Sequence, residues 1–354
     1  MKNIGVLTGG GDCPGLNAAI RAVVRHAIDA YSFNVIGFKR GWAGPLEGLI
    51  EPLTKYAVSG ILPKGGTILG TSRTNPDKVE DGYLKIKENF KKFGLDAIVV
   101  IGGNDTLGVA GNLQLKYDVP CVCIPKTIDN DVACTDYTIG FDTAVSIATA
   151  AIDNLHSTAE SHDRVMVVEV MGWHAGWIAA FTGIAGGADL ILVPEKNFNM
   201  DEVCELVKSR HKRRGKSYSI IVAAEGASSD DGRVSARSDK ADAFGHIILG
   251  GLGVNLSDEI EKRTGFETRY ALLGHIQRGG TPTPSDRILA TRLGVKAVDL
   301  VARGETGKMV GISGGSITSV PVMDIVETDK KGHYVGKTKT LDMEYFEVAK
   351  VFFG

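Results

Sequence analysis

The chain has 354 residues, more than the roughly 250–300 at which one hydrophobic core stops growing, so we expect two linked lobes. Its composition, 43% hydrophobic and 23% charged, is typical of globular proteins and excludes the disordered and fibrous classes. A net charge of −2 gives no electrostatic reason to expect a nucleic acid partner, and no apolar window approaches the roughly 20 residues of a membrane span. We therefore expect a cytoplasmic protein with neither partner.

Strand-like and helical patterns alternate in the first part of the chain. Strands are predicted at 3–8, 97–101 and 119–124, and helices from about 16 to 28, 104 to 116 and 143 to 161. The first helix has apolar residues at helical spacing, which predicts one buried face. Such alternation favours parallel sheets with ligands at the carboxyl ends of the strands.

A second alternating series follows. Strands are predicted at 164–170, 190–193, 218–224 and up to Leu273, and helices from about 200 to 214, 244 to 264 and 284 to 303. The same α/β pattern therefore applies to both parts of the chain. Strand-like runs continue after Lys308.

Two glycine-rich loops follow predicted strands. The first is Gly9-Gly10-Gly11, and the second is Gly102-Gly103 with Asn104, Asp105 and Thr106. A loop of this kind before a helix presents unpaired N–H groups and a positive helix end to an anion. Together they suggest a polyphosphate lying across both loops, although the first alone could be a structural turn. Neither has the context of a dinucleotide-binding fingerprint, which disfavours an oxidoreductase.

The stretch 125–131 carries the groups that phosphoryl transfer needs. These are a base for the attacking hydroxyl, a hard oxygen ligand for Mg²⁺ and a positive charge for the phosphate oxygens. Asp129, Asp131 and Lys126 offer all three. The alternative interpretation is a polar turn in which Asp129 caps a helix.

Four motifs in this order resemble those of the phosphofructokinase family. They are Gly11 with Asp12-x-Pro14-Gly15, Thr127-Ile128-Asp129-Asn130-Asp131, Met171-Gly172, and Gly274-His275-Ile276-Gln277-Arg278-Gly279-Gly280. The resemblance implies an α/β fold of two doubly wound lobes with mostly parallel sheets and the active site in the cleft between them. Residues 1–140 plus 277–327 would form the phosphoryl-donor lobe, and 141–276 plus 328–354 the sugar-phosphate lobe.

The resemblance also implies roles for the residues around the donor. Asp129 would take the proton from the sugar's 1-hydroxyl, Thr127 would lie close to the transferring phosphate, and Arg73 would stabilise charge on the donor. Asp131 and Asn104 would be on the metal side, with Mg²⁺ as the cofactor. The donor-binding set is Gly11, Gly103, Asn104, Asp105, Thr106 and Lys126.

Further residues are implied for the sugar phosphate. Besides Thr127 and Asp129 they are Met171, Gly172, Glu225, His275 and Arg278, with Arg164 and Arg269 lent to a neighbouring subunit's site. The expected assembly is therefore a homodimer or homotetramer with shared sites. Independently of the family, we expect Arg269, His275 and Arg278 at a strand end and the loop that follows it.

Two positions bear on the phosphoryl donor. ATP-using members of the family have glycine where this chain has Asp105 and Lys126, and pyrophosphate-using members typically have Asp and Lys. An aspartate puts bulk and negative charge where a nucleotide's α-phosphate would lie, while the lysine can reach a compact diphosphate. We expect reversible phosphoryl transfer from pyrophosphate to fructose 6-phosphate, giving fructose 1,6-bisphosphate and phosphate; an ATP-dependent 6-phosphofructokinase is the alternative.

Two departures from the family pattern affect the catalytic groups. Asn104 stands where Asp or Glu is usual near Mg²⁺, and Trp173 replaces an arginine after Met171-Gly172. Each removes a charge from the expected site. They motivate a third hypothesis, a catalytically impaired subunit that binds phosphosugars and partners an active paralogue.

Overall fold

The computed structural model describes residues 1–212, 218–235, 251–351 and Phe353. These form two compact units. Unit 1 contains Met1–Thr143 and Arg278–Thr338, and unit 2 contains 144–235, 251–277 and the described residues after 338. Two predicted helix ends lie outside the described residues: the start of the helix predicted at 244–264 and the end of the helix predicted at 200–214.

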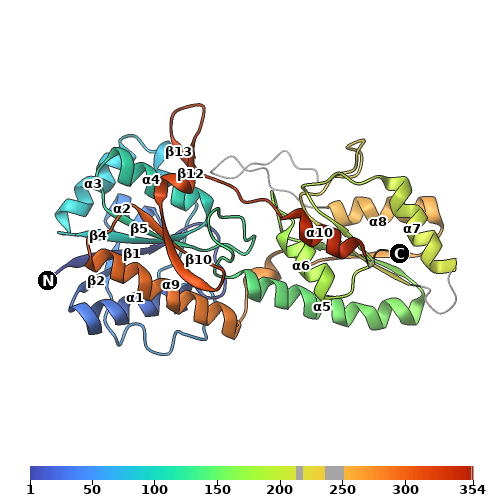
Figure 1. The fold of residues 1–354 in the computed structure, drawn as a ribbon, viewed down its shortest axis with the longest axis horizontal. Helices are drawn as coiled ribbons and strands as arrows, with labels where there is room; N and C mark the ends of the chain where they lie inside the picture. Colours follow the sequence, from blue (N-terminus) through green and yellow to red (C-terminus); the bar gives the residue numbers. More distant parts are fainter. Residues whose placement is uncertain (213–217, 236–250, 352, 354) are drawn as a thin grey trace. The chain divides into compact units, whose positions relative to one another are not determined.

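Unit 1 is built on a seven-stranded sheet in the order β11-β10-β5-β4-β1-β2-β3 (Figure 1). Its strands are β1 (Asn3–Thr8), β2 (Asn34–Phe38), β3 (Ile50–Pro52), β4 (Ala97–Gly102), β5 (Cys121–Pro125), β10 (Lys308–Ser313) and β11 (Ser316–Pro321). The five inner strands run parallel, whereas β3 and β11 pair antiparallel at the two edges. The carboxyl ends of β1, β4 and β5 therefore share one edge of the sheet.

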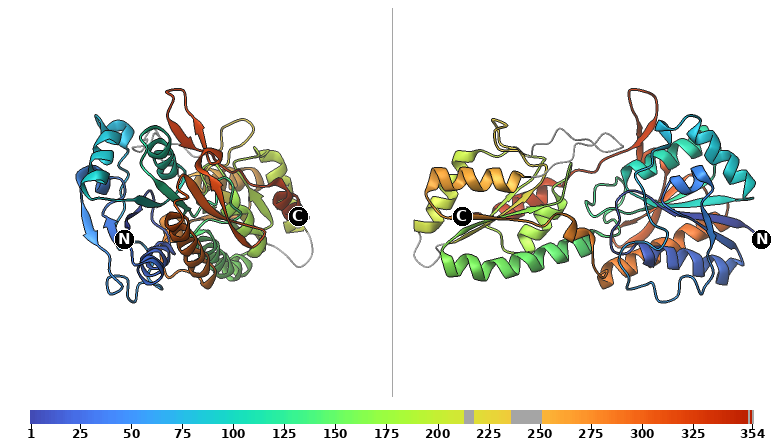
Figure 2. Two further views of the ribbon diagram at one scale, coloured as in Figure 1. Left: turned by 60° about the vertical axis from the view of Figure 1, so that its left-hand side comes forward. Right: turned by 180° about the vertical axis from the view of Figure 1, so that it is seen from behind.

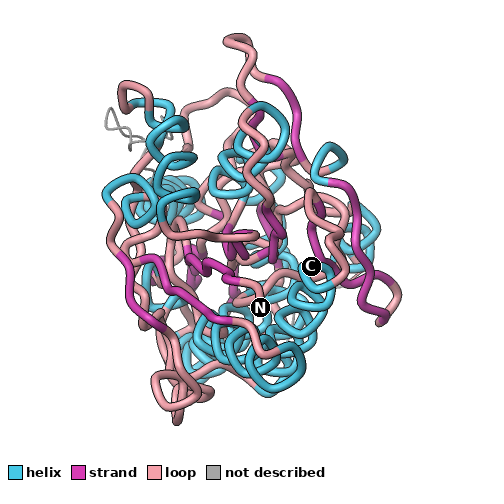
Figure 3. Tube along the Cα trace, turned by 90° about the vertical axis from the view of Figure 1, so that its left-hand side faces the viewer, coloured by secondary structure: helices cyan, strands magenta, loops and turns pink. Residues whose placement is uncertain are grey.

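Helices cover both faces of this sheet. On one side α1 (Leu16–Tyr31) packs against α9 (Pro284–Ala302); on the other lie α2 (Ala43–Glu47), α3 (Gly82–Lys92) and α4 (Asn104–Lys116). Figure 3 views this unit from its end, with strands between helical layers. Every residue of β4 and β5 is buried, as expected for strands covered on both faces.

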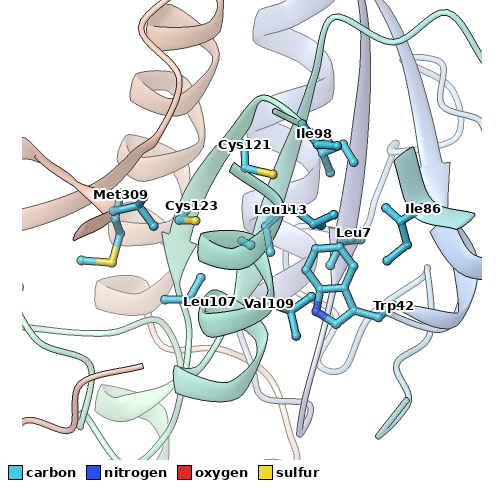
Figure 4. Packing of buried hydrophobic residues seen from close by; sticks show 14 of the residues in the cluster. Leu7, Trp42, Ile86, Ile98, Leu107, Val109, Leu113, Cys121, Cys123 and Met309 are labelled. Atoms are coloured by element: carbon cyan, nitrogen blue, oxygen red, sulfur yellow. The ribbon is translucent and has the colours of Figure 1, made fainter. Parts of the chain in front are cut away.

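The core of unit 1 between the sheet and α4 is closely packed (Figure 4). Leu107 and Leu113 of α4 meet Leu7 of β1 and Ile98 of β4, with the fully buried Trp42 beside them. Burial of such side chains stabilises each by about 1.5–3 kcal/mol relative to exposure. This packing fixes the position of α4, and hence of the glycine loop at its start.

A short hairpin also belongs to unit 1. β12 (Val326–Thr328) pairs antiparallel with β13 (Tyr334–Gly336), and β13 packs on α4. The segment 328–338 therefore belongs to unit 1, whereas the sequence analysis placed it in the second, sugar-phosphate lobe. The reason is a set of contacts with α4, which periodicity alone does not reveal.

Unit 2 has a four-stranded parallel sheet in the order β7-β8-β6-β9. Its strands are β6 (Val165–Val170), β7 (Leu190–Leu192), β8 (Ser219–Ala224) and β9 (Thr268–Leu272). Its helices are α5 (Phe141–His162), α6 (Trp177–Ala185), α7 (Met200–Lys212), α8 (Leu252–Thr264) and α10 (Met343–Lys350). The first residues of α5 belong to unit 1. One face of the sheet packs against α7 and α8 (Figure 2). The predicted α/β class with mostly parallel sheets is confirmed. No helix among the described residues could span a membrane.

Candidate active site

The loops after β1 and β4 lie side by side at a switch in strand order. From β1 the chain adds β2 on one side and later β4 on the other, so the crevice between β1 and β4 opens at their carboxyl ends. The N–H of Gly9 donates to the carbonyl oxygen of Ile101 at 2.9 Å. Both predicted glycine loops are therefore brought together, in front of the starts of α1 and α4.

Thr106 packs between the two loops. Its side chain is 2% exposed, and a Cβ added at Gly9 or at Gly102 would lie 2.6 or 2.3 Å from its Cγ2. Only glycine leaves room for this contact. The structure thus gives Thr106, a predicted donor ligand, a packing role that holds the two loops together.

Two cations lie against Gly11. The Nζ of Lys126 donates to the Gly11 carbonyl oxygen at 2.5 Å, and the backbone N–H of Lys126 donates to the Gly102 carbonyl oxygen at 2.9 Å. Burial, with the side chain only 2% exposed, lowers the pKa of Lys126. Arg278 donates from Nη1 to the Asp12 carbonyl at 3.3 Å, and a Cβ on Gly11 would lie 2.5 Å from that Nη1. Arg278, predicted for the sugar phosphate, is thus placed at the glycine loop.

The segment that carries Arg73 is attached to the same loop. Thr71 Oγ1 donates to the Gly10 carbonyl at 2.5 Å, and Ser72 Oγ donates to the Arg40 carbonyl at 2.6 Å. Arg73 follows directly and is exposed. An arginine in this place can reach an anion bound by the loop.

The loop that presents Asp129 is held by its own polar groups. Thr127 Oγ1 accepts the Asp129 N–H at 3.1 Å, and Thr138 Oγ1 donates to the Thr127 carbonyl at 2.6 Å. Asn130 is buried with φ of 52°, and its Oδ1 accepts the Thr138 N–H at 3.0 Å. Asp129 caps no helix, since α5 begins at Phe141. The alternative of a capping aspartate is therefore wrong.

Asn104 and Asp131 are in direct contact. Asn104 Nδ2 donates to Asp131 Oδ2 and to the Asp131 carbonyl, both at 3.1 Å. Burial, and then the charge of Asp129, raise the pKa of Asp131 to about 7. Asn104 Oδ1 is buried without a hydrogen-bond partner among the described residues. An orphaned oxygen beside a carboxylate suits a hard cation such as Mg²⁺, which also takes ligands from the substrate's phosphates.

The described residues contain no group of three or more His, Cys, Asp or Glu side chains that could hold a metal. Mg²⁺ is commonly bound through only one or two carboxylates plus substrate phosphates. Asn104 and Asp131 remain the groups that fit the cation.

One buried carboxylate was missed by the sequence analysis. Asp286, 1% exposed, accepts the N–H of Gly140 and of Thr143, both at 2.8 Å, and the Thr143 hydroxyl at 2.5 Å. It thereby anchors the end of the Asp129 loop to α9. Thr283 caps the first turn of α9, since its hydroxyl oxygen accepts the Asp286 N–H at 3.3 Å. Thr283-Pro284-x-Asp286 is a recognisable helix start. The contact with Gly140 has no local signal.

In unit 2, the predicted sugar ligands Met171 and Gly172 follow β6, and Glu225 follows β8. The Glu225 N–H donates to Val170 at 2.9 Å. Gly226 leaves room for the carbonyl of Trp173, which would lie 2.1 Å from an added Cβ. His275 follows β9, the other neighbour of β6. These residues share the carboxyl edge of the second sheet.

Arg164 and Arg269 lie at the opposite, amino edge of that sheet. Arg164 precedes β6, and Arg269 is the second residue of β9. Both donate to the Glu267 carboxylate, Arg164 at 2.7 Å and Arg269 at 2.6 Å. The hydrogen bond from Arg164 is the main cause that holds the pKa of that carboxyl below its usual range. The expectation that Arg269 lies with His275 at a strand end is therefore wrong, because β9 starts at Thr268.

Comparison with known proteins is decisive for the family. Residues 3–301 match the family model described as Phosphofructokinase. The chain belongs to the phosphofructokinase family. This confirms the resemblance seen in the motifs and the expectation of a phosphoryl-transferring enzyme.

Relatives within the phosphofructokinase family carry two kinds of name. The chain is 54% identical over 352 residues to a pyrophosphate–fructose 6-phosphate 1-phosphotransferase of Streptomyces coelicolor, covering 99% of both chains. It is 49% identical over 352 residues to an ATP-dependent 6-phosphofructokinase of Mycobacterium tuberculosis, again covering 99% of both.

Solved structures agree on the fold. Phosphofructokinase of Pichia pastoris in the T-state has a TM-score of 0.81 and 35% identity, covering 91% of this chain and 37% of the yeast chain. Pyrophosphate-dependent phosphofructokinase of Marinobacter aquaeolei has a TM-score of 0.79 and 24% identity, covering 98% of this chain and 86% of that one.

Proposed function

We propose that the protein transfers a phosphoryl group from pyrophosphate to the 1-hydroxyl of fructose 6-phosphate, reversibly, in glycolysis and gluconeogenesis in the cytoplasm. The observation that carries the choice of donor is the contact of Lys126 Nζ with the Gly11 carbonyl, 2.5 Å away. It puts a buried ammonium among the glycine loops at the starts of α1 and α4. A compact dianionic group bound by these loops would lie within its reach.

Asp105 supports the same choice of donor. It lies in the first turn of α4, and its negative charge adds to the raised pKa of Asp131 nearby. A nucleotide needs space and positive potential at its α-phosphate, and a carboxylate there opposes both. Pyrophosphate has no such group. Relatives at 54% identity that are named for pyrophosphate fit this interpretation.

The chemistry follows from the loop after β5. In the proposed reaction, the sugar's 1-hydroxyl oxygen attacks the terminal phosphorus, the bond to the bridging oxygen breaks, and orthophosphate leaves with the electron pair. Asp129 takes the hydroxyl proton. Its loop is fixed by Asn130 and Thr138, which keeps the base in place before the substrate arrives. Arg73 and Lys126 face the charge that moves onto the leaving phosphate.

Asn104 Oδ1 and Asp131 would hold Mg²⁺ together with the donor's own oxygens. When bound, the ion would neutralise charge on the phosphates. In this chain the amide of Asn104 orients the Asp131 carboxylate through Nδ2. Only one of these two ligands then carries a charge.

Besides Thr127 and Asp129, the sugar phosphate is assigned to Met171, Gly172, Glu225, His275 and Arg278, with a second subunit supplying Arg164 and Arg269. β6 has six residues at about 3.3 Å each, so its two edges are about 20 Å apart. A fructose 6-phosphate held at the carboxyl edge therefore lies beyond the reach of Arg164 of the same chain, and Arg269, level with Met166, is about 13 Å from that edge. This favours a homodimer or homotetramer with shared sites.

A donor panel tests the proposal. Purified protein with Mg²⁺ and fructose 6-phosphate should form the bisphosphate with pyrophosphate, and at least tenfold less efficiently with ATP. Turnover with ATP and none with pyrophosphate would support the second candidate, an ATP-dependent 6-phosphofructokinase, which the names at 49% identity favour. No turnover by the protein alone would instead support the impaired-subunit hypothesis raised by Asn104 and Trp173.

A further inference from the structure

The hairpin at 326–336 lies along α4 from its first residue to its last. Gly336 meets the backbone of Asn104, Tyr334 and Val335 meet Gly108, and the carbonyl of Gly332 accepts from Lys116 Nζ at 2.5 Å. The labels β12, β13 and α4 lie together in Figure 1. The hairpin thus reaches the helix end that faces the glycine loops.

Two glycines bring the backbones of hairpin and helix into direct contact. A Cβ on Gly108 would lie 3.0 Å from both the Tyr334 carbonyl oxygen and Val335 Cα. A Cβ on Gly336 would lie 2.6 Å from the Asn104 carbonyl oxygen and 2.7 Å from its Cα. No side chain fits between the hairpin and the start of α4. The flank of the helix end is therefore closed by backbone.

The two arms of the hairpin are held differently. Val326 of β12 is buried in the core, whereas β13 is less buried and adds polar contacts to the packing of Tyr334 against that core. Asn112 Nδ2 donates to the Tyr334 carbonyl at 2.8 Å, and the Tyr334 N–H donates to Asn112 Oδ1 at 3.1 Å. His333 pairs with Asp77 at 3.2 Å, beside a cavity of about 260 Å³. Single changes can therefore loosen β13 without opening the core.

We infer that this hairpin is a wall of the donor site that restricts the donor to a compact inorganic diphosphate. The inference rests on the proposed function, since it concerns the donor of that same site. A diphosphate at the start of α4 needs no room beyond the loops. A longer chain or an attached nucleoside needs space beside the helix end, and β13 fills that flank.

The test compares three donors, namely pyrophosphate, tripolyphosphate and ATP, each with fructose 6-phosphate. Asn112→Ala removes both bonds to Tyr334, and Gly108→Ala pushes β13 outward. Each should raise kcat/KM for the two larger donors relative to pyrophosphate by about tenfold or more, with the KM for fructose 6-phosphate unchanged. Asn89→Ala is the matched control, because Asn89 also donates to two backbone carbonyls, those of Pro45 and Leu46.

Hydrogen exchange at the Tyr334 amide reports whether β13 has been released. A variant with residues 327–336 replaced by a short glycine linker removes β13, including Gly336 at the start of α4. If this variant keeps the wild-type donor ratio, the inference is overturned even when the wild type uses pyrophosphate. Wild-type turnover with ATP alone overturns the proposed donor instead, so the two failures are distinguishable.

Discussion

Lys126 Nζ bonds to the backbone carbonyl of Gly11, a residue 115 positions earlier in the chain. The contact joins the loops after β5 and β1 and places a cation where three loops meet. It can serve a ligand, the packing of the loops, or both. Substitution separates these roles, because they predict opposite effects on stability.

Lys126→Met keeps the aliphatic stem and removes the charge. We expect kcat/KM for pyrophosphate to fall by about 10- to 100-fold, since a charged hydrogen bond contributes about 1.5–3 kcal/mol. The free energy of unfolding should stay constant or rise, because a buried ammonium is replaced by an apolar group. Steady-state kinetics with thermal unfolding measure both. Lys39→Met, half-exposed beside Glu51, is the control. A large loss of stability with normal pyrophosphate kinetics would show a structural lysine.

Asp129→Ser removes the proposed base. The chemical step should slow by about 10²–10⁴-fold, while the Kd for fructose 6-phosphate stays within a few-fold of wild type. Single-turnover kinetics and calorimetric binding measure the two quantities. Asp136→Asn, in the same loop, should leave the chemical step nearly unchanged. Equal loss of binding and rate in Asp129→Ser would make its role structural.

Local patterns revealed much of this site. The strands β1, β4 and β5 are apolar runs that end in glycine or in the charged stretch, so their loops could be placed at one edge of a sheet. Asn104 and Asp131 were assigned to the metal side together, and they are in contact. These are features that lie within a few residues of a strand end.

What the sequence analysis missed depends on register and on distant contacts. Arg269 was grouped with His275 because the start of β9 carries no signal that separates the two edges of the sheet. Residues 32–96, for which no elements were predicted, contain β2, α2, β3 and α3. Asp286 and Gly140 are 146 residues apart, and their hydrogen bond follows only from the packing of α9.

Asn104→Asp places a second carboxylate against Asp131. Without metal the two charges repel, so the unfolding temperature at neutral pH should fall by several degrees. Adding Mg²⁺ should restore it, and half-maximal activity should need less Mg²⁺ than in wild type. Asn154→Asp, at an exposed position of α5, controls for the added charge. An unfolding temperature that does not respond to Mg²⁺ in Asn104→Asp would argue against a metal at this pair.

Asp286 should make stability depend on pH. Burial raises its pKa to about 6 in the folded protein, whereas the unfolded value is 3.8. Between these values the folded state binds more protons, so its contribution is present below about pH 4 and is lost as the pH rises through 6. The loss is about 3 kcal/mol.

Asp286→Asn should abolish this dependence. The free energy of unfolding of wild type minus that of the variant should fall by about 3 kcal/mol between pH 4 and pH 7, measured with denaturant. Thr283→Val removes the α9 cap without removing a titrating group, so it should cost about 1 kcal/mol at both pH values. A difference between wild type and Asp286→Asn that is constant with pH would contradict the assignment.

Shared sites between subunits predict complementation between inactive variants. Arg269→Ala lacks the arginine that would be lent to a neighbour, and Asp129→Ser lacks the base, so each alone should be nearly inactive. In a hybrid dimer one site combines the intact base of the first protein with the intact arginine of the second. After unfolding and refolding together in equal amounts, about a quarter of wild-type activity should return. Light scattering would confirm the oligomer. Mixing Asp129→Ser with Lys126→Met, both altered at the donor loops of unit 1, is the matched control, and its activity should not exceed the residual activity that Lys126→Met retains alone. No gain in the first mixture would mean that each chain builds its sugar site alone.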